Sequence, residues 1–328
     1  MNHKFYMKLA IKKAWENQGF SYPNPSVGAV IVDGNGKILS VATNNWGKAH
    51  AEVNATRIAY GKLHKKCKIK DATKLHNFLC ENHNGLFEDC TIYVTLEPCN
   101  HYGKTPPCSL LIESLNFKRV VVAIKDTNKI AVGGIKRLKD CAIKVTLGIC
   151  ENEAKKLIFP FKKWNSGNFI FFKLALSLNG IISPGIITSQ TSRKMVHKLR
   201  DKIDLLVIGG NTVRVDNPIL DSRLVGGNVP DILIYSRQKN FDKNLKLFKV
   251  KNREVYIENN FEKLKNYKYI MIEGGETMLK SCEKIIDCYL IFQSPHFKSG
   301  NGINYNLKLS KLNSYTNREN DIVNWLKT

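Results

Sequence analysis

A chain of 328 residues with 43% hydrophobic side chains is long enough for two packed domains of about 150 residues each, which excludes a disordered or fibrous protein. Its formal net charge is +23, from 51 basic and 28 acidic side chains, so nucleic-acid binding has to be considered beside catalysis. The basic residues are mostly Lys and are scattered along the chain, which favours a solvated surface over a nucleic-acid groove.

Cysteine usage and hydropathy predict a cytoplasmic protein that does not enter a membrane. The chain has nine cysteines, an odd number in a protein too large to need disulfide staples, and this indicates a reducing compartment. Residues 1–15 mix Lys with apolar side chains and do not resemble a secretory signal. The most apolar stretch, 169–178, contains Lys173 and is too short to cross a bilayer.

The first 150 residues predict an alternation of strands and helices. We expect helices over 5–17, 51–60 and 108–115, a hairpin of strands over 27–32 and 38–43, and further strands over 91–96, 120–124 and 143–147. The order β-α-β-α-β favours a three-layer α/β domain. The polar, basic residues 62–90 are interpreted as a surface insertion. The alternative for this insertion is a second metal site, for which its Cys and His spacings fit no standard template: His64, Cys67, His76, Cys80 and His83.

One imidazole and two thiols in this first half form a candidate zinc site. His50 stands at the start of the helix over 51–60, Cys99 follows the strand over 91–96, and Cys108 opens the next helix. Zinc held by three such ligands keeps a fourth position for water, which loses its proton near neutral pH. Glu52 lies beside His50 and is the candidate proton shuttle. His-x-Glu followed by Pro-Cys and a second Cys is the zinc nucleobase-deaminase signature.

Two alternatives stay open around this motif. A closed, purely structural zinc site would need a fourth ligand, for which His101 is the candidate. Asn24, at the entry to the hairpin, could bind polar edges of a base, but its spacing alone favours a turn-forming residue.

The second half predicts another α/β domain, so we divide the chain into domains 1–150 and 166–328 with a linker at about 151–165. A helix over 151–158 is expected to stop at Pro160, and a helix over 191–200 to start from Ser189 as its N-cap. Strands are expected over 169–176, 205–208, 231–235, 255–257, 269–272 and 288–293. Glycine turns at 209–212 and 273–277 follow two of these strands and could approach phosphates, but neither is a GxGxxG fingerprint.

Nearly the whole chain resembles the bifunctional riboflavin-biosynthesis deaminase-reductases of bacteria. The residues that carry this resemblance in the first half are Pro23-Asn24-Pro25-Ser26-Val27-Gly28, His50-Ala51-Glu52, Glu97-Pro98-Cys99 and Thr105-Pro106-Pro107-Cys108. In the second half they are Lys173 to Gly180, Thr212 to Leu220 with Arg223, Glu273-Gly274-Gly275 and Ser294 to Gly300. The resemblance implies a cytidine-deaminase-like three-layer domain followed by a dihydrofolate-reductase-like α/β domain.

The resemblance also implies site residues, cofactors and partners. It implies one zinc ion held by His50, Cys99 and Cys108, with Glu52 catalytic, and NADPH in the second domain. Substrate contacts would come from Asn24, Arg200, Leu220, Arg223 and Glu273. NADPH contacts would come from Leu176, Ile186, Thr212, Asp216, Ser236, Gly275, Glu276, Thr277, Met278 and Leu279. The expected partner is a small phosphorylated pyrimidine, with no nucleic acid or membrane, and a homo-oligomer (dimer or tetramer) is expected.

The reductase half departs from the family pattern. Asn179 stands where Asp is usual, Ile181 where Arg is usual and Ile186 where Trp is usual. One alternative is therefore a deaminase whose second domain is weakly active or only supports assembly. The other, suggested by the net charge, is a zinc-stabilised nucleic-acid-binding protein.

Overall fold

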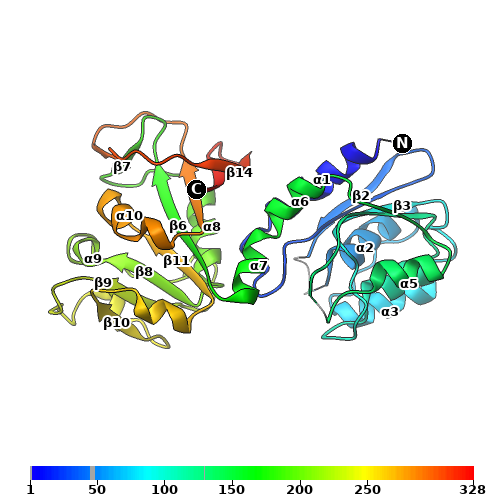
Figure 1. Cartoon of the computed structure of the whole chain (residues 1–328), viewed down its shortest axis with the longest axis horizontal. Coiled ribbons are helices and arrows are strands. Elements are labelled where there is room, and N and C mark those ends of the chain that lie inside the picture. The colour runs from blue at the N-terminus through cyan, green and yellow to red at the C-terminus, as the bar shows by residue number, and fades with distance from the viewer. Residues whose placement is uncertain (1, 45–48, 129) are drawn as a thin grey trace. The chain divides into compact units, whose positions relative to one another are not determined.

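The computed structural model describes residues 2–44, 49–128 and 130–328, which divide into two compact units, Met1–Phe161 and Lys162–Thr328. Figure 1 colours the chain from the N-terminus to the C-terminus, and the two units are described separately below. Among the described residues, no helix is both long and apolar enough to span a membrane.

The first unit is a sheet covered by helices on both faces. Its strands are β1 (Gly28–Val32), β2 (Ile38–Thr43), β3 (Thr91–Leu96), β4 (Arg119–Ile124) and β5 (Lys144–Leu147). In the described part they form one sheet in the order β2-β1-β3-β4-β5, antiparallel up to β3 and parallel from β3 to β5. The predicted hairpin and strands are confirmed.

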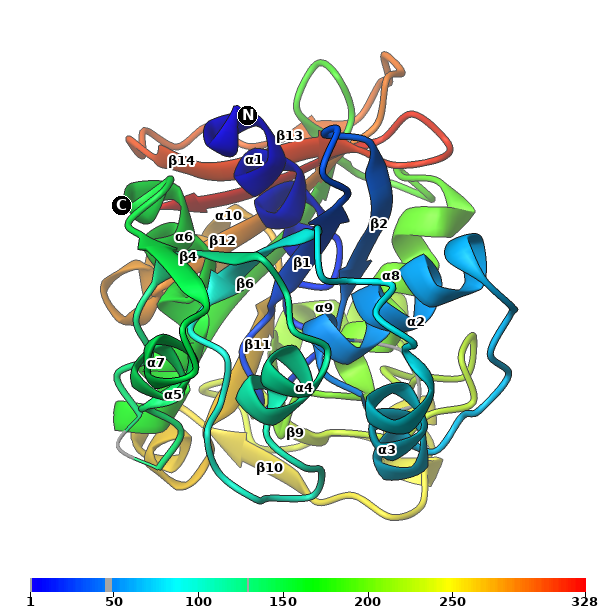
Figure 2. The same ribbon diagram turned by 90° about the vertical axis from the view of Figure 1, so that its right-hand side faces the viewer.

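Helices pack on both faces of this sheet. They are α1 (His3–Trp15), α2 (Ala51–Leu63), α3 (Ala72–Asn82), α4 (Cys108–Ser114), α5 (Gly134–Asp140) and α6 (Glu151–Leu157). α1 packs on β1, β2 and β3 and also contacts α6, whereas α2 packs on β1 and β2 from the face that carries α3, α4 and α5 (Figure 2). β1, β3 and β4 are almost wholly buried, which agrees with their mainly apolar and β-branched sequences.

The insertion at 62–90 differs from the expectation. Residues 64–70 are mostly exposed, but Asp71 caps α3 by accepting from the Lys74 NH, and this helix buries a row of side chains. The buried residues are Ala72, Leu75, His76 and Leu79. The prediction of a surface insertion is therefore wrong for α3, because its i, i+3, i+4 apolar pattern is hidden in a polar composition.

The segment predicted as a linker is largely helical. α6 ends at Leu157, and α7 (Phe159–Ser166) starts almost at once with Pro160 in its first turn. A proline at that position costs nothing, since the NH groups of the first turn have no partner within the helix. Pro160 therefore separates two helices and does not end the helical region.

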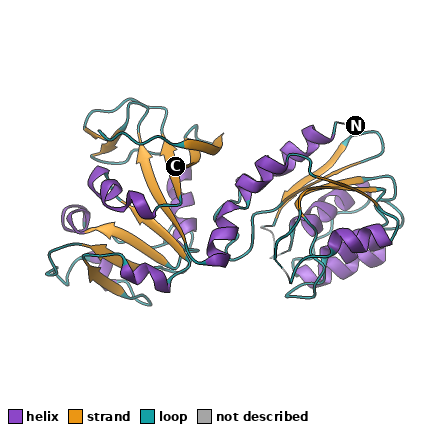
Figure 3. Ribbon diagram, in the orientation of Figure 1, coloured by secondary structure: helices purple, strands orange, loops and turns teal. Residues whose placement is uncertain are grey.

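The second unit is built on a larger, mainly parallel sheet (Figure 3). Its main strands are β6 (Phe169–Leu176), β8 (Leu205–Gly209), β9 (Asp231–Tyr235), β10 (Val255–Glu258), β11 (Tyr269–Glu273), β12 (Cys288–Gln293), β14 (Ser310–Thr316) and β15 (Ile322–Lys327). The order is β10-β9-β8-β11-β6-β12-β15-β14, with β15 antiparallel to β12 and β14 antiparallel to β15. Two short strands, β7 (Ile181–Ser183) and β13 (Asn301–Gly302), pair separately.

The six strands predicted in this unit are confirmed, and β14 and β15 were not predicted. Helices α8 (Gln190–Arg200), α9 (Gly210–Asp216) and α10 (Glu276–Cys282) and the 3₁₀ turns η1 (Lys246–Lys249), η2 (Glu262–Asn266) and η3 (Glu283–Ile285) join the strands. Ser189 caps α8 as expected, accepting from the Ser192 NH. The parallel strands bring their carboxyl ends to one edge, where ligands of open α/β sheets bind.

Candidate active sites

His50, Cys99 and Cys108 converge in the first unit. The Nδ1 atom of His50 lies 3.5 Å from the Cys99 Sγ and 3.3 Å from the Cys108 Sγ, and the three ligand atoms lie within 4.8 Å of one another. In tetrahedral zinc sites such atoms are about 3.5–3.8 Å apart, given Zn–S and Zn–N bonds of about 2.3 and 2.0 Å. The two distances from His50 are close to those of a zinc site, and the chemistry of the three ligand atoms fits zinc.

Local structure explains why the two helix starts meet. His50 is the N-cap of α2 in extended conformation and makes no side-chain capping bond, so its ring is available to a ligand. Pro107 is the N-cap of α4, which makes Cys108 the first helical residue. The Cys108 NH points at the Cys99 Sγ, 3.4 Å away, and such an NH group at a helix start stabilises a thiolate.

The two thiols share one proton when no metal is bound. The hydrogen bond from Cys108, followed by contacts with His50, lowers the pKa of Cys99 to about 4, whereas the pKa of Cys108 is raised well above its ordinary value. Burial lowers the pKa of His50, but the hydrogen bond and charge of Cys99 outweigh it and raise this pKa to about 8. Cys99 is therefore a thiolate at neutral pH, which is the form that binds a metal cation.

Glu52 lies in the first turn of α2 and is only 4% exposed. Burial raises the pKa of its carboxyl to about 7. A carboxyl with a pKa near the working pH can both accept and return a proton, which is what a general acid-base residue needs. Its side chain also hydrogen-bonds Cys108, so the proton shuttle and the ligand group are in contact.

The alternatives for metal binding find no support among the residues that the structure describes. The candidate metal group contains His50, Cys99 and Cys108, and His101 is not part of it. Among the described residues the insertion at 62–90 provides no comparable group of three, although Cys80 Sγ lies 3.7 Å from His76 Nδ1. The candidate group in the described residues therefore matches the three-ligand pattern.

Glu97 lies in the Glu97-Pro98-Cys99 motif but was not predicted as a functional residue, and it organises the loop next to Cys99. Its buried carboxylate accepts from the Asp126, Gly133 and Ile135 NH groups at 3.0–3.2 Å. A Cβ on Gly134 would lie 1.9 Å from the Pro98 carbonyl oxygen, so only glycine permits this close packing. The start of α5 is thereby fixed against the metal loop.

His76 of the inserted helix α3 supports the second thiol. Its Nε2 lies 3.1 Å from the Pro107 carbonyl oxygen, which can only accept, so this nitrogen carries the proton and Nδ1 can accept from the Cys80 thiol. The residue is 1% exposed. A hydrogen bond to the residue that precedes Cys108 orients the ligand from outside the metal group.

Asn24 is exposed, and its NH donates to the Ser21 carbonyl oxygen at 2.9 Å, which is a turn geometry. Its contact with a substrate stays a prediction.

In the second unit, Glu273 at the end of β11 is the centre of a charged cluster. Arg200 of α8 donates to both carboxylate oxygens of Glu273, at 2.9 and 3.1 Å from Nη2, and Lys173 of β6 lies 3.7 Å away. The side chains of Arg200 and Glu273 are only 11% and 13% exposed. Burial would raise the pKa of Glu273, but Arg200 and then Lys173 hold it at about 2.

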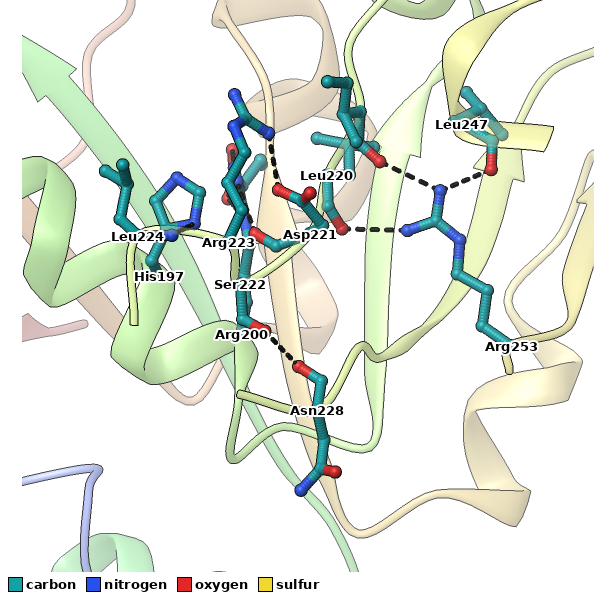
Figure 4. Close-up of polar contacts among 12 residues, drawn as sticks. His197, Arg200, Leu220, Asp221, Ser222, Arg223, Leu224, Asn228, Leu247 and Arg253 are labelled. Atoms are coloured by element: carbon teal, nitrogen blue, oxygen red, sulfur yellow. Dashed lines mark hydrogen bonds and ion pairs between the residues drawn. The ribbon is translucent and has the colours of Figure 1, made fainter. Parts of the chain in front are cut away.

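The segment 219–224 lies beside this cluster and carries two of the predicted substrate residues (Figure 4). Arg200 Nη1 donates to the Asp221 carbonyl oxygen at 3.3 Å, and Arg223 pairs with the Asp221 carboxylate. The Arg223 side chain is 50% exposed, whereas Leu220 is 4% exposed. Arg223 is thus the more accessible of these two predicted substrate residues.

The predicted NADPH residues gather at the carboxyl edge of the parallel strands. Leu176 ends β6, Thr212 and Asp216 lie in α9 after β8, Ser236 follows β9, and the 275–279 turn follows β11. The start of α9 lies against Ser236, because a Cβ on Gly210 would come within 2.6 Å of its Oγ. Ile186 is 62% exposed, and its carbonyl oxygen accepts from Lys298 Nζ at 2.6 Å.

Asn179 uses both ends of its amide. Its Nδ2 donates to the Lys298 carbonyl oxygen at 2.8 Å, and its Oδ1 accepts from the Lys298 NH at 3.0 Å and the Ser177 hydroxyl at 2.7 Å. An aspartate would lack the donor, so the departure from the family pattern has a local structural reason.

Two family descriptions match the chain. Residues 1–124 match the cytidine and deoxycytidylate deaminase zinc-binding region, and residues 168–302 match the RibD C-terminal domain. The riboflavin biosynthesis protein RibD of Aquifex aeolicus is 32% identical over 89% of this chain and 86% of that protein.

Solved structures agree over almost the whole chain. The diaminohydroxyphosphoribosylaminopyrimidine deaminase/5-amino-6-(5-phosphoribosylamino)uracil reductase of Thermotoga maritima has a TM-score of 0.65 at 25% identity and covers 99% of this chain and 98% of its own. Acinetobacter baumannii RibD, form 1, has a TM-score of 0.64 at 26% identity with the same coverage.

The folds and sites therefore define a bifunctional enzyme, with a zinc-binding deaminase domain followed by a reductase domain of the NADPH-binding type. Both fold classes expected from the sequence are confirmed. The chain belongs to the RibD family of riboflavin biosynthesis proteins.

Proposed function

We propose that the first domain hydrolytically deaminates 2,5-diamino-6-ribosylamino-4(3H)-pyrimidinone 5′-phosphate and that the second reduces the ribosyl chain of the product with NADPH. The product would be 5-amino-6-ribitylaminouracil phosphate. The observation that carries the proposal is the convergence of His50, Cys99 and Cys108 with buried Glu52, in a chain whose Thr105-Pro106-Pro107-Cys108 motif sets a long spacing between the two thiols.

In the deaminase domain His50, Cys99 and Cys108 would hold zinc, which supplies a water of lowered pKa when it is bound. The Glu52 carboxylate accepts the proton of this water as the oxygen adds to the amino-bearing ring carbon. Glu52 passes this proton to the ring nitrogen. It then takes up the proton of the added hydroxyl and passes it to the amino group, which leaves as ammonia as the carbonyl forms. Water and the amine are thus exchanged for a carbonyl and ammonia, and Glu52 ends in its starting state.

In the reductase domain NADPH supplies a hydride, and the protein orients the two reactants. Leu176, Ile186, Thr212, Asp216 and Ser236, with the 275–279 turn, are proposed to hold the cofactor. Arg223 is proposed to bind the substrate phosphate, because a guanidinium matches two phosphate oxygens. Arg200 and Glu273 would contribute as a pair, since every nitrogen of the Arg200 guanidinium already has an acceptor in the described chain.

The test is an assay of the full chain with the diaminopyrimidine substrate, with and without NADPH, in which ammonia and reduced product are measured separately. We expect ammonia without NADPH and reduced product only when NADPH is added. Failure to release ammonia contradicts the deaminase assignment, and ammonia without reduction selects the alternative of an inactive second domain.

We further propose that the enzyme works in the cytoplasm and binds neither nucleic acid nor membranes. In support, none of the nine cysteines, all within the described residues, forms a disulfide. A dimer or tetramer stays a prediction, which analytical ultracentrifugation tests.

A further inference from the structure

Arg253 lies outside every motif of the sequence, yet it binds the main chain of the proposed substrate segment (Figure 4). It stands just before β10, and its guanidinium donates to three carbonyl oxygens. Nη1 donates to Leu220 at 2.9 Å, and Nη2 donates to Ile219 at 2.9 Å and to Leu247 of η1 at 2.5 Å. The side chain thereby ties residues 219 and 220 to η1.

The segment that Arg253 holds has an unfavourable backbone. Leu220 has a φ of 57° and Asn217 a φ of 41°, and leucine rarely adopts this left-handed region. Such a conformation persists only where its surroundings impose it. A second contact acts in the same direction, because the Asn217 Oδ1 accepts from the Lys246 NH of η1 at 2.8 Å.

Two guanidinium groups hold the carbonyls of three successive residues. Arg253 binds those of Ile219 and Leu220, and Arg200 binds that of Asp221. The next charged group along the chain is Arg223, which pairs with the Asp221 carboxylate. The position of Arg223 therefore depends on how residues 219–221 are fixed.

The chemistry of the site requires arginine. Arg253 binds neutral carbonyl oxygens, and its planar fork reaches three of them at once. Lysine keeps the charge but has a single nitrogen, which cannot reproduce this geometry. Although burial lowers the pKa of Arg253 to about 10, the group stays protonated at neutral pH.

We propose that Arg253 is a positioning residue for the reductase substrate: it fixes residues 219–221 so that Arg223 is presented to the phosphorylated ribosyl group. This inference rests on the proposed function of the second domain. It predicts a selective effect on the substrate, because Arg253 touches none of the residues proposed to bind NADPH among its recorded contacts in the described chain.

The experiment compares the full-length variants Arg253→Met, Arg253→Lys and Arg318→Met. Arg318 is an exposed arginine of the same unit and serves as the control. For Arg253→Met and Arg253→Lys we expect the KM for the deaminated ribosylamino phosphate to rise on the order of ten- to a hundred-fold, the cost of misplacing a binding group by about 1 Å. The KM for NADPH and the rate of deamination should change less than about twofold, as in Arg318→Met.

An unchanged substrate KM in a folded Arg253→Met enzyme, or full rescue by Arg253→Lys, overturns the inference. If Arg253→Met does not fold, the Lys variant decides: a raised KM supports the inference and a normal one overturns it. Amide hydrogen exchange of residues 217–224 needs no turnover. Faster exchange in the Arg253 variants than in Arg318→Met supports the fixation, and equal exchange overturns it. A wild-type enzyme that deaminates but does not reduce overturns the proposed reductase function instead, independently of the exchange result.

Discussion

Replacing Glu273 by Gln tests whether the charged cluster of the second unit stabilises the fold as well as the site. The carboxylate is 13% exposed, and its pKa is held at about 2 against an ordinary value of 4.5, mainly by Arg200 and Lys173 against the effect of burial. A shift of this size corresponds to about 3 kcal/mol of folding free energy at neutral pH. Glu273→Gln also leaves two nearly buried cations without a counter-charge, so we expect a loss of about 3–5 kcal/mol.

The pH dependence gives the sign of the effect. Because the pKa of Glu273 is lower in the folded than in the unfolded protein, its contribution is complete above about pH 4.5 and is lost as the pH falls toward 2. The difference in unfolding free energy between wild type and Glu273→Gln should therefore be constant from pH 7 to about 5 and shrink below that.

The assay is urea unfolding followed by tryptophan fluorescence, to which Trp164 and Trp325 of this unit contribute, with deamination as an independent measure of the first unit. Glu262→Gln is the matched control, since its pair with Lys265 is 74% exposed on both sides and should be worth less than about 1 kcal/mol. Equal stability of Glu273→Gln and wild type at pH 7, or a difference that does not shrink in acid, would refute the reasoning.

The remaining predictions concern the two proposed activities. Cys99→Ala should lose bound zinc in metal analysis, and full retention would place the metal elsewhere. Glu52→Gln should keep zinc and fold but release ammonia about a hundred- to ten-thousand-fold more slowly, so near-normal release contradicts its role. Arg223→Ala should weaken substrate binding by about 1.5–3 kcal/mol, seen as a raised KM with the NADPH constant and deamination unchanged; lost NADPH affinity would contradict this. His76→Leu should weaken zinc affinity about ten- to a hundred-fold in chelator competition, with partial rescue by His76→Gln; equal affinities would show that His76 does not orient the ligand.

The sequence by itself determined the fold classes and the residues of the candidate deaminase site. Buried parallel strands such as β4 and β11 are continuous apolar runs, and turn residues mark their ends, so local patterns predict them. His50, Glu52, Cys99 and Cys108 were found because their chemistry and spacing lie within short motifs. Helix α3 was missed, since its apolar stripe is embedded in a basic, polar stretch.

Only the tertiary structure decided which residues support these sites. Arg253 and Leu220 are 33 residues apart in sequence, and His76 and Pro107 are 31 apart. In both pairs the acceptor is a main-chain carbonyl, a group that every residue carries and that leaves no mark in the sequence. The Arg200–Glu273 pair was predicted as two separate substrate contacts, but its buried, bidentate geometry appears only when β11 and α8 come together. The reactive side chains lie within short sequence motifs, whereas the hydrogen bonds that orient these side chains depend on how distant segments pack.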